Sequence, residues 1–308
     1  MPKLGILAIV ICLALFAGLF VVVDPAKVIA AFGDVSAGSV VVALLIVQVQ
    51  IVLSALRWQF TAARLGHRIS RSLAVREYYV SSVLNQVLPG GMAGDAVRAY
   101  RNRTEEPGGW KRPATAVFLE RLSGQLAFFL MTGLGLIAWP VFLADRLPEG
   151  FAGLALTFLA LLVCGLGVGI FVWRSKLSAR FERLKPDLVA AFWRDGAGWV
   201  QVLLSASIVA GYVSTFLIAS HAVGAPLPPI GAFTAVPLCL LTMLIPAGIG
   251  GWGTREVAAA ALWPLFGFTS AQGVSASLLY GSLSLAGAAL PGLVVIAHQV
   301  LTGRIGRA

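Results

Sequence analysis

The chain has 308 residues, of which 58% are hydrophobic and only 12% are charged, and its mean hydropathy is +0.89. An ordinary soluble domain has about 25% charged residues, so this chain has too few ionisable side chains to cover a surface surrounded by water. Composition therefore excludes a soluble enzyme, a disordered tail, a fibrous repeat and a disulfide-rich secreted module. The net charge of +10 comes from basic residues between apolar spans, which indicates loops facing anionic lipid and no nucleic-acid partner.

Uncharged stretches predict the membrane spans, because a helix needs about 20 mostly apolar residues to cross a hydrocarbon core of about 30 Å. They are Leu4–Val23, Val35–Leu56, Leu122–Ala144, Gly150–Trp173, Gly196–Thr254 and Val257–Gly303. The first is too long for the apolar region of a signal peptide, so we expect a retained helix. Prolines divide the fifth after a helix of about Val200–His221, and the last crossing is expected at about Gly273–His298.

Three clusters of arginine and lysine predict the orientation of these spans, since loops rich in positive charge stay in the cytoplasm. The clusters are Arg57 to Arg76, Arg98 to Arg112, and Arg174 to Lys185. The connections around residues 24–34, 145–149 and 221–229 carry few or no positive charges and are expected outside. Both termini are then cytoplasmic. The segment Arg57–Arg76 resembles a basic helix that lies on the inner leaflet.

The segment Glu77–Val97 lies between two of these basic clusters, so both of its ends are expected in the cytoplasm and a re-entrant hairpin satisfies this condition. A helix over Glu77–Leu88 would extend about 18 Å, which reaches just past the middle of the membrane. Proline and glycine at residues 89–94 then break the helix. A second break of the same kind, at residues 246–253, predicts a second hairpin that enters from the outside.

The two breaks align at an offset of 157 residues, from Pro89 to Pro246. The matching strings are Pro89-x-Gly91-Met92-x-Gly94-x-x-x-Arg98 and Pro246-x-Gly248-Ile249-x-Gly251-x-x-x-Arg255. Inverted repeats whose broken helices meet near the midplane are typical of secondary transporters. We predict one transmembrane domain over residues 1–308, with inverted-repeat units at about 35–144 and 196–300. The alternative is that glycine and proline only let helices pack closely or kink.

The predicted fold class is therefore an all-α polytopic membrane protein. It would have about six full transmembrane helices plus two re-entrant broken-helix hairpins in an inverted repeat, with the N and C termini cytoplasmic. A half-helix that begins inside the membrane presents unpaired N–H groups and a partial positive charge, which suit an anion. Arg98 and Arg255, expected in the first turns of these half-helices, would add two-pronged contacts to a phosphate. Asp95 and Thr254 are the expected N-caps.

Acid–base couples also lie at membrane depth, where charges usually face a cavity or a partner. Glu120-Arg121 opens the third predicted span, and Arg255-Glu256 opens the last half-helix. Two roles stay open for them, either ligand binding or structural pairs such as Arg98 with Glu120 or Arg121 with Glu256. Asn85 and Gln86, at the tip of the first hairpin, are expected to bond freed backbone carbonyls or a headgroup.

The candidate substrate-binding residues are at these two breaks and beside them. They are Asn85, Gln86, Pro89, Gly90, Gly91, Gly94, Asp95, Arg98, Glu120, Arg121, Pro246, Gly248, Gly250, Gly251, Gly253, Arg255 and Glu256. No catalytic residue, metal ligand or cofactor is predicted, because the chain has no HExxH, DDxxD or P-loop motif. The predicted ligand is anionic with a large apolar part, and a lipid with a headgroup phosphate fits.

These motifs resemble the transmembrane flippase domain of lysylphosphatidylglycerol synthetases and its stand-alone relatives. The resemblance covers about residues 35–300. It rests on Asn85-x-x-Leu88-Pro89-Gly90-x-x-x-Gly94-Asp95-x-x-Arg98, on Glu120-Arg121 and on Pro246-x-Gly248-Ile249-Gly250-Gly251-x-Gly253-x-Arg255-Glu256. This sequence departs from the family at Ala93, where a glycine is frequent, and at Gly281, where an arginine is frequent.

The resemblance implies a stand-alone member without the synthetase domain, multi-pass in a bacterial-type cytoplasmic (inner) membrane. Such a protein would be no enzyme but a flippase, moving an anionic lipid between leaflets with the motif residues lining its cavity. The lipid classes left open are phospholipids, aminoacylated phospholipids and related isoprenoid lipids. The expected partners are membrane lipids with anionic headgroups, and a homo-oligomer is compatible with the sequence. The alternatives are an intramembrane enzyme acting on lipid phosphates and an envelope-assembly scaffold.

Overall fold

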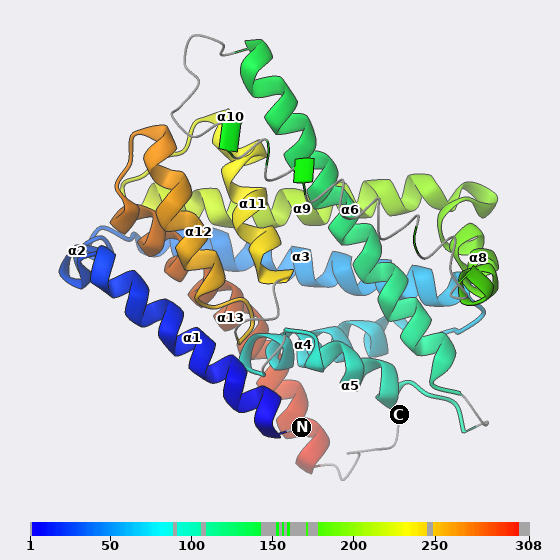
Figure 1. Cartoon of the computed structure of the whole chain (residues 1–308). Helices are drawn as coiled ribbons and strands as arrows, with labels where there is room; N and C mark the ends of the chain where they lie inside the picture. Colours follow the sequence, from blue (N-terminus) through cyan, green and yellow to red (C-terminus); the bar gives the residue numbers. More distant parts are fainter. Residues whose placement is uncertain are drawn as a thin grey trace.

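The computed structural model describes residues 2–88, 91–105, 109–142, 152–153, 156, 159–160, 171, 178–244 and 249–301. Within these ranges every regular element is a helix (Figure 1). Four helices are long and apolar enough to cross a membrane, and they are Ala37–Arg64, Lys111–Ala138, Arg194–Ala222 and Ser270–His298. The prediction of a helical, multi-pass membrane protein is therefore confirmed. The number of six spans, the re-entrant course of the hairpins and the side of the termini stay predictions.

The helices follow one another along the chain with short connections. They are α1 (Pro2–Val22), α2 (Pro25–Ala30), α3 (Ala37–Arg64), α4 (Arg71–Val87), α5 (Ala93–Arg101), α6 (Lys111–Phe142), α8 (Ser178–Phe192), α9 (Ala197–Ala222), α10 (Pro229–Phe233), α11 (Ala235–Leu241), α12 (Thr254–Leu262) and α13 (Ser270–Leu301). Short 3₁₀ helices cover Arg194–Gly196, Thr242–Leu244 and Trp263–Phe266. The predicted span Gly150–Trp173 lies almost wholly outside the described residues.

The second and third predicted spans are longer helices than expected. The helix α3 begins after Ser36, whose hydroxyl accepts the Ser39 N–H at 3.1 Å. It continues beyond the predicted end of the span and stops only at Arg64. The interfacial helix predicted over Arg57–Arg76 is therefore wrong, because Arg57 is buried inside α3. Likewise α6 begins at Lys111, so the Glu120-Arg121 couple lies within a helix and does not open one.

Both predicted helix breaks are present. The helix α4 ends before the first break and α5 starts after it, at Ala93, while α12 restarts the chain after the second break, at Thr254. Gly250, Gly251 and Gly253 have φ values of 57°, 81° and 89°, a backbone region that suits glycine. Four predicted site residues lie outside the described residues, and they are Pro89, Gly90, Pro246 and Gly248.

The helix bounds recur at the offset of 157 residues that aligns the two breaks. Shifted by this offset, α3, α4 and α6 would cover 194–221, 228–244 and 268–299, which nearly coincide with α9, with α10 to the 3₁₀ helix at 242–244, and with α13. Helix contacts follow the same exchange. The helix α4 packs against α13 as α11 packs against α6, and α3 packs against α13 as α9 packs against α6.

The helices α3 and α9 cross the molecule side by side and run antiparallel (Figure 1). Arg64 at the end of α3 contacts Asp195, just before α9 begins. Further back along α3, Arg57 contacts Ser205, and Gln50 lies against Gly211. Residue numbers therefore rise along one helix as they fall along the other, which is the relation that oppositely oriented repeats require.

Candidate functional site: a buried ion cluster beside the first break

Five charged side chains from three helices meet beside the first break. Arg57 comes from α3, Asp95 and Arg98 come from α5, and Glu120 and Arg121 come from α6. Four of them are almost fully buried, with exposed fractions of 0–4%, and Arg121 is partly exposed. Buried charges carry a large desolvation cost unless they are paired, so this cluster is held together by its internal contacts.

Glu120 lies at the centre of the cluster. Arg57 Nη2 donates to Glu120 Oε1 at 2.6 Å, and the hydroxyl of Tyr78 donates to the same oxygen at 3.2 Å. Arg98 Nη2 donates to Glu120 Oε2 at 3.1 Å. One carboxylate thus joins α3, α4, α5 and α6, so the hairpin formed by α4 and α5 is fixed to both long helices.

Arg98 is shared between the two acids of the cluster. Its Nη2 also contacts Asp95 Oδ1 at 2.9 Å, and Arg121 Nη2 contacts Asp95 Oδ2 at 2.6 Å. The guanidinium carbon of Arg98 lies 4.4 Å from the ring centroids of both Trp58 and Tyr78, within the range of cation–π attraction. The two aromatic rings therefore hold the arginine in place while leaving part of its hydrogen-bonding edge free.

These contacts decide between the pairs left open by the sequence. The pair of Arg98 with Glu120 is confirmed. The pair of Arg121 with Glu256 is wrong, because Arg121 contacts Asp95 and Glu256 contacts Arg255. The sequence analysis missed Arg57, which it assigned to a loop. A helical spacing of polar residues indicates its buried position, since Gln50, Ser54, Arg57 and Thr61 are all buried on α3.

The N-terminus of α5 is closed by a side chain of α4. Asn85 Oδ1 accepts the N–H of Gly94 at 2.8 Å and the N–H of Asp95 at 3.3 Å. Asn85 therefore bonds amides and not the carbonyls or headgroup that were expected. The N-cap position is Met92 and not Asp95, and Arg98 lies in the second turn of α5. The free N–H groups predicted for an anion are thus occupied here, and the arginines are the remaining anion-binding groups.

Replacing Asn85 by Ala removes this side-chain cap. We expect the protein to lose about 1 kcal/mol of stability, the usual effect of losing a helix cap. The amides of Gly94 and Asp95 should then exchange hydrogen faster, because their acceptor is gone. Asn85→Asp keeps an oxygen acceptor and is the matched variant. Equal exchange at these two amides in Asn85→Ala and the wild type would contradict this role.

The second break forms a smaller buried cluster. Arg255 Nη2 donates to Glu256 Oε1 at 2.8 Å, and Arg255 Nε donates to the Ser277 hydroxyl at 2.8 Å. That hydroxyl donates in turn to Glu256 Oε1 at 2.8 Å. Glu256 Oε2 accepts the N–H of Gly253, which is the N-cap of α12, so the predicted cap Thr254 is wrong. The side chains of this cluster therefore satisfy one another.

Arg255 occupies an aromatic setting like that of Arg98. Its guanidinium carbon lies 5.1 Å from the Trp252 ring centroid and 5.0 Å from that of Tyr280. A Cβ atom at Gly281 would collide with Arg255 Nη2 and would lie 2.7 Å from the Trp252 ring. The glycine that departs from the family pattern is therefore needed here, because Arg255 fills the space of a side chain at that position.

The two breaks touch one another. A Cβ atom at Gly250 would lie 2.5 Å from the carbonyl oxygen of Gln86 and 2.7 Å from its Cα, so only glycine permits this approach. The Gln86 side chain donates to the Ser284 carbonyl of α13 at 3.3 Å. The predicted site residues of the two halves, far apart in sequence, are thus brought together at the tips of the broken helices. Gly91 and Gly251 also have positive φ values.

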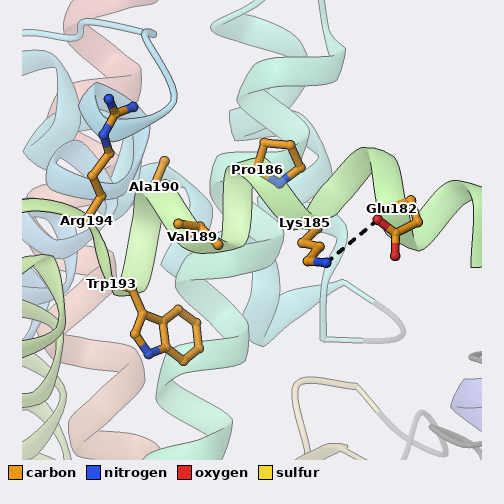
Figure 2. A pocket seen from close by; sticks show the side chains of 7 residues that line it. All are labelled: Glu182, Lys185, Pro186, Val189, Ala190, Trp193 and Arg194. Carbon is orange, nitrogen blue, oxygen red and sulfur yellow. Dashed lines mark ion pairs between the residues drawn. The ribbon is translucent and has the colours of Figure 1, made fainter.

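A shallow pocket lies away from these clusters, along α8 (Figure 2). It is lined by Glu182, Lys185, Pro186, Val189, Ala190, Trp193 and Arg194, none of which is a predicted site residue. Lys185 and Glu182 form an ion pair of 3.9 Å, drawn as a dashed line in Figure 2, and both side chains are 60% exposed. Because all of its lining residues are on one helix and the turn that follows, it is a surface feature of α8 and no part of the site.

Comparisons with known proteins agree with the motifs. A search of curated proteins finds no match to this chain. The family model described as "Lysylphosphatidylglycerol synthase TM region" matches residues 5–292. That range contains both breaks and all five charged residues of the first cluster. The chain therefore belongs to the family of the lysylphosphatidylglycerol synthase transmembrane region.

Proposed function

We propose that the protein is a lipid flippase that moves an anionic lipid between the leaflets of a bacterial-type inner membrane. The observation that carries this proposal is the state of Arg98. This side chain is 1% exposed, and its Nε and Nη1 atoms have no hydrogen-bond partner among the described residues. Charged side chains at membrane depth are costly and typically mark substrate pathways. An arginine with donors to spare suits a phosphate group.

The arrangement of the two halves supports a transport mechanism. The antiparallel packing of α3 and α9, and the recurrence of helix bounds at 157 residues, fit two inverted units that meet at their broken helices. Rocking of one unit against the other would expose Arg98 and its cluster to each leaflet in turn. The contact between Gly250 and Gln86 is the point at which the two units would part.

The proposed protein is a transporter and no enzyme, and its partner is a membrane lipid with an anionic headgroup. The sequence contains no P-loop motif, so no nucleotide-driven step is proposed. An ion gradient, the membrane potential or consumption of the lipid on the far side would supply the energy. The acyl chains would stay in the bilayer, while the headgroup passes along the buried charged residues.

Transport by arginine variants tests this proposal. We expect Arg98→Gln and Arg255→Gln each to slow the movement of fluorescent phosphatidylglycerol in proteoliposomes by about tenfold or more, because each removes a buried cation. The matched control is Arg103→Gln, which removes an exposed arginine that stacks on Tyr100 at 3.9 Å. A folded Arg98→Gln/Arg255→Gln double variant that transports at the wild-type rate would contradict the proposal.

A further inference from the structure

The first cluster holds one more positive charge than it can neutralise. It contains three arginines, Arg57, Arg98 and Arg121, and two acids, Asp95 and Glu120. The shortest contacts divide them into two pairs. Arg57 lies 2.6 Å from Glu120, and Arg121 lies 2.6 Å from Asp95. Each acid therefore has an arginine of its own, and Arg98 is the surplus cation.

Arg98 makes the longer contacts in the cluster, at 2.9 Å to Asp95 and 3.1 Å to Glu120, and both use its Nη2 atom alone. Its Nε and Nη1 atoms have no hydrogen-bond partner in the part of the chain that the structure describes. If Arg98 turned toward a ligand, both acids would keep their closest partners. Arg98 is therefore the one arginine of this cluster that can bind an anion without leaving a buried acid unpaired.

The second cluster has no such surplus. Arg255 faces Glu256, and Ser277 and the Gly253 N–H take up the other described contacts of the pair. One cation and one anion cancel, so this half of the molecule offers no uncompensated charge. The symmetry suggested by the two sequence motifs is thus broken in the charges. The anion-binding group is in the first half alone.

We infer that the site selects a headgroup with a single negative charge, a phosphodiester, which Arg98 binds while Arg57 and Arg121 act as positioning residues by neutralising the two acids. This inference rests on the proposed function and names its substrate class. A phosphodiester carries one negative charge and matches the surplus of one. A phosphomonoester carries between one and two negative charges near neutral pH, so it would bring excess negative charge into a buried site.

Charge rescue tests this inference by binding, without any need for transport. The full chain is placed in nanodiscs of phosphatidylcholine, and the affinity for fluorescent phosphatidylglycerol is measured. We expect Arg57→Gln to weaken binding about tenfold or more although Arg98 is intact, because Glu120 then takes Arg98 as its only arginine. The double variant Arg57→Gln/Glu120→Gln restores the surplus of one charge. Its affinity should therefore return to within about threefold of the wild type.

The other variants use the same assay. Glu120→Gln raises the surplus to two charges and should shift the preference about tenfold toward phosphatidate at pH 8, while Arg103→Gln is the surface control. If Arg57→Gln does not fold, Arg121→Gln with its rescue Arg121→Gln/Asp95→Asn tests the same pairing rule. Binding by Arg57→Gln at the wild-type affinity, or a double variant as weak as the single, would overturn the inference.

Two more outcomes separate this inference from its premise. Soluble glycerophosphoglycerol should compete far less well than the lipid, and equal competition would overturn the assignment to a lipid headgroup. The expected rescue pattern in a protein that moves no lipid would support the charge rule and contradict the proposed function alone. Transport that depends on Arg98 but shows no rescue would contradict the charge rule alone.

Discussion

Glu120→Ala is expected to destabilise the protein by about 3–5 kcal/mol, the usual cost of removing one partner from a buried ion pair. Glu120 has no exposed surface, and its carboxylate is the acceptor for Arg57, Arg98 and Tyr78. Truncating it leaves two buried guanidinium groups with fewer negative partners and opens space between α3, α5 and α6. Thermal and denaturant unfolding of the purified protein in detergent measure the loss.

Two variants show whether the loss comes from the uncompensated charge. Glu182→Ala removes an acid from the exposed pair with Lys185, where a surface ion pair contributes about 0–1 kcal/mol, so little change is expected. Arg57→Met/Glu120→Leu removes a buried pair together and should cost less than Glu120→Ala alone. An unfolding free energy of Glu120→Ala equal to that of Glu182→Ala would contradict the central place given to Glu120.

Gly94→Ala is expected to force apart the two arms of the first hairpin. A Cβ atom at Gly94 would overlap the carbonyl oxygen of Ser81 on α4 and would lie 2.9 Å from Asn85 Oδ1. Overpacking of this kind costs about 1–3 kcal/mol, because the backbone must shift to make room. The same shift would displace Arg98 on α5, so lipid movement should fall together with the unfolding temperature.

The matched control for this change is Gly18→Ala. Gly18 lies within α1, and a Cβ atom there would meet no heavy atom within 4 Å. Alanine is the better helix former, so this variant should be at least as stable as the wild type. If Gly94→Ala unfolds at the same temperature as Gly18→Ala, the close approach of α4 and α5 does not limit this position.

Much of the fold was predictable because its determinants are local in sequence. Long apolar stretches predict helices that cross a membrane, and the predicted helices at about Val200–His221 and Gly273–His298 are confirmed as α9 and α13. Glycine and proline predict both helix breaks for steric reasons that need no tertiary contact. Arg98 with Glu120 was also predictable, since opposite charges at membrane depth must find partners.

The errors came from contacts between residues far apart in the chain. Arg57 was placed in a loop because a charge next to an apolar stretch usually marks the end of a span. Here α3 continues, because Glu120 of α6 neutralises that charge inside the bundle. Asn85 takes the role of a helix cap that sequence rules assign to Asp95, since α4 folds back against α5. Such partners depend on packing, which one sequence alone does not specify.

The most direct test of the proposed function is the movement of lipid by the purified wild-type protein. Liposomes with and without the protein carry fluorescent phosphatidylglycerol in the inner leaflet, and a membrane-impermeant quencher reports its arrival in the outer leaflet. We expect the protein to transfer the lipid faster than protein-free liposomes do, and Arg98→Gln to lose most of this transfer. A folded, reconstituted protein that leaves the lipid in its original leaflet would contradict the proposal.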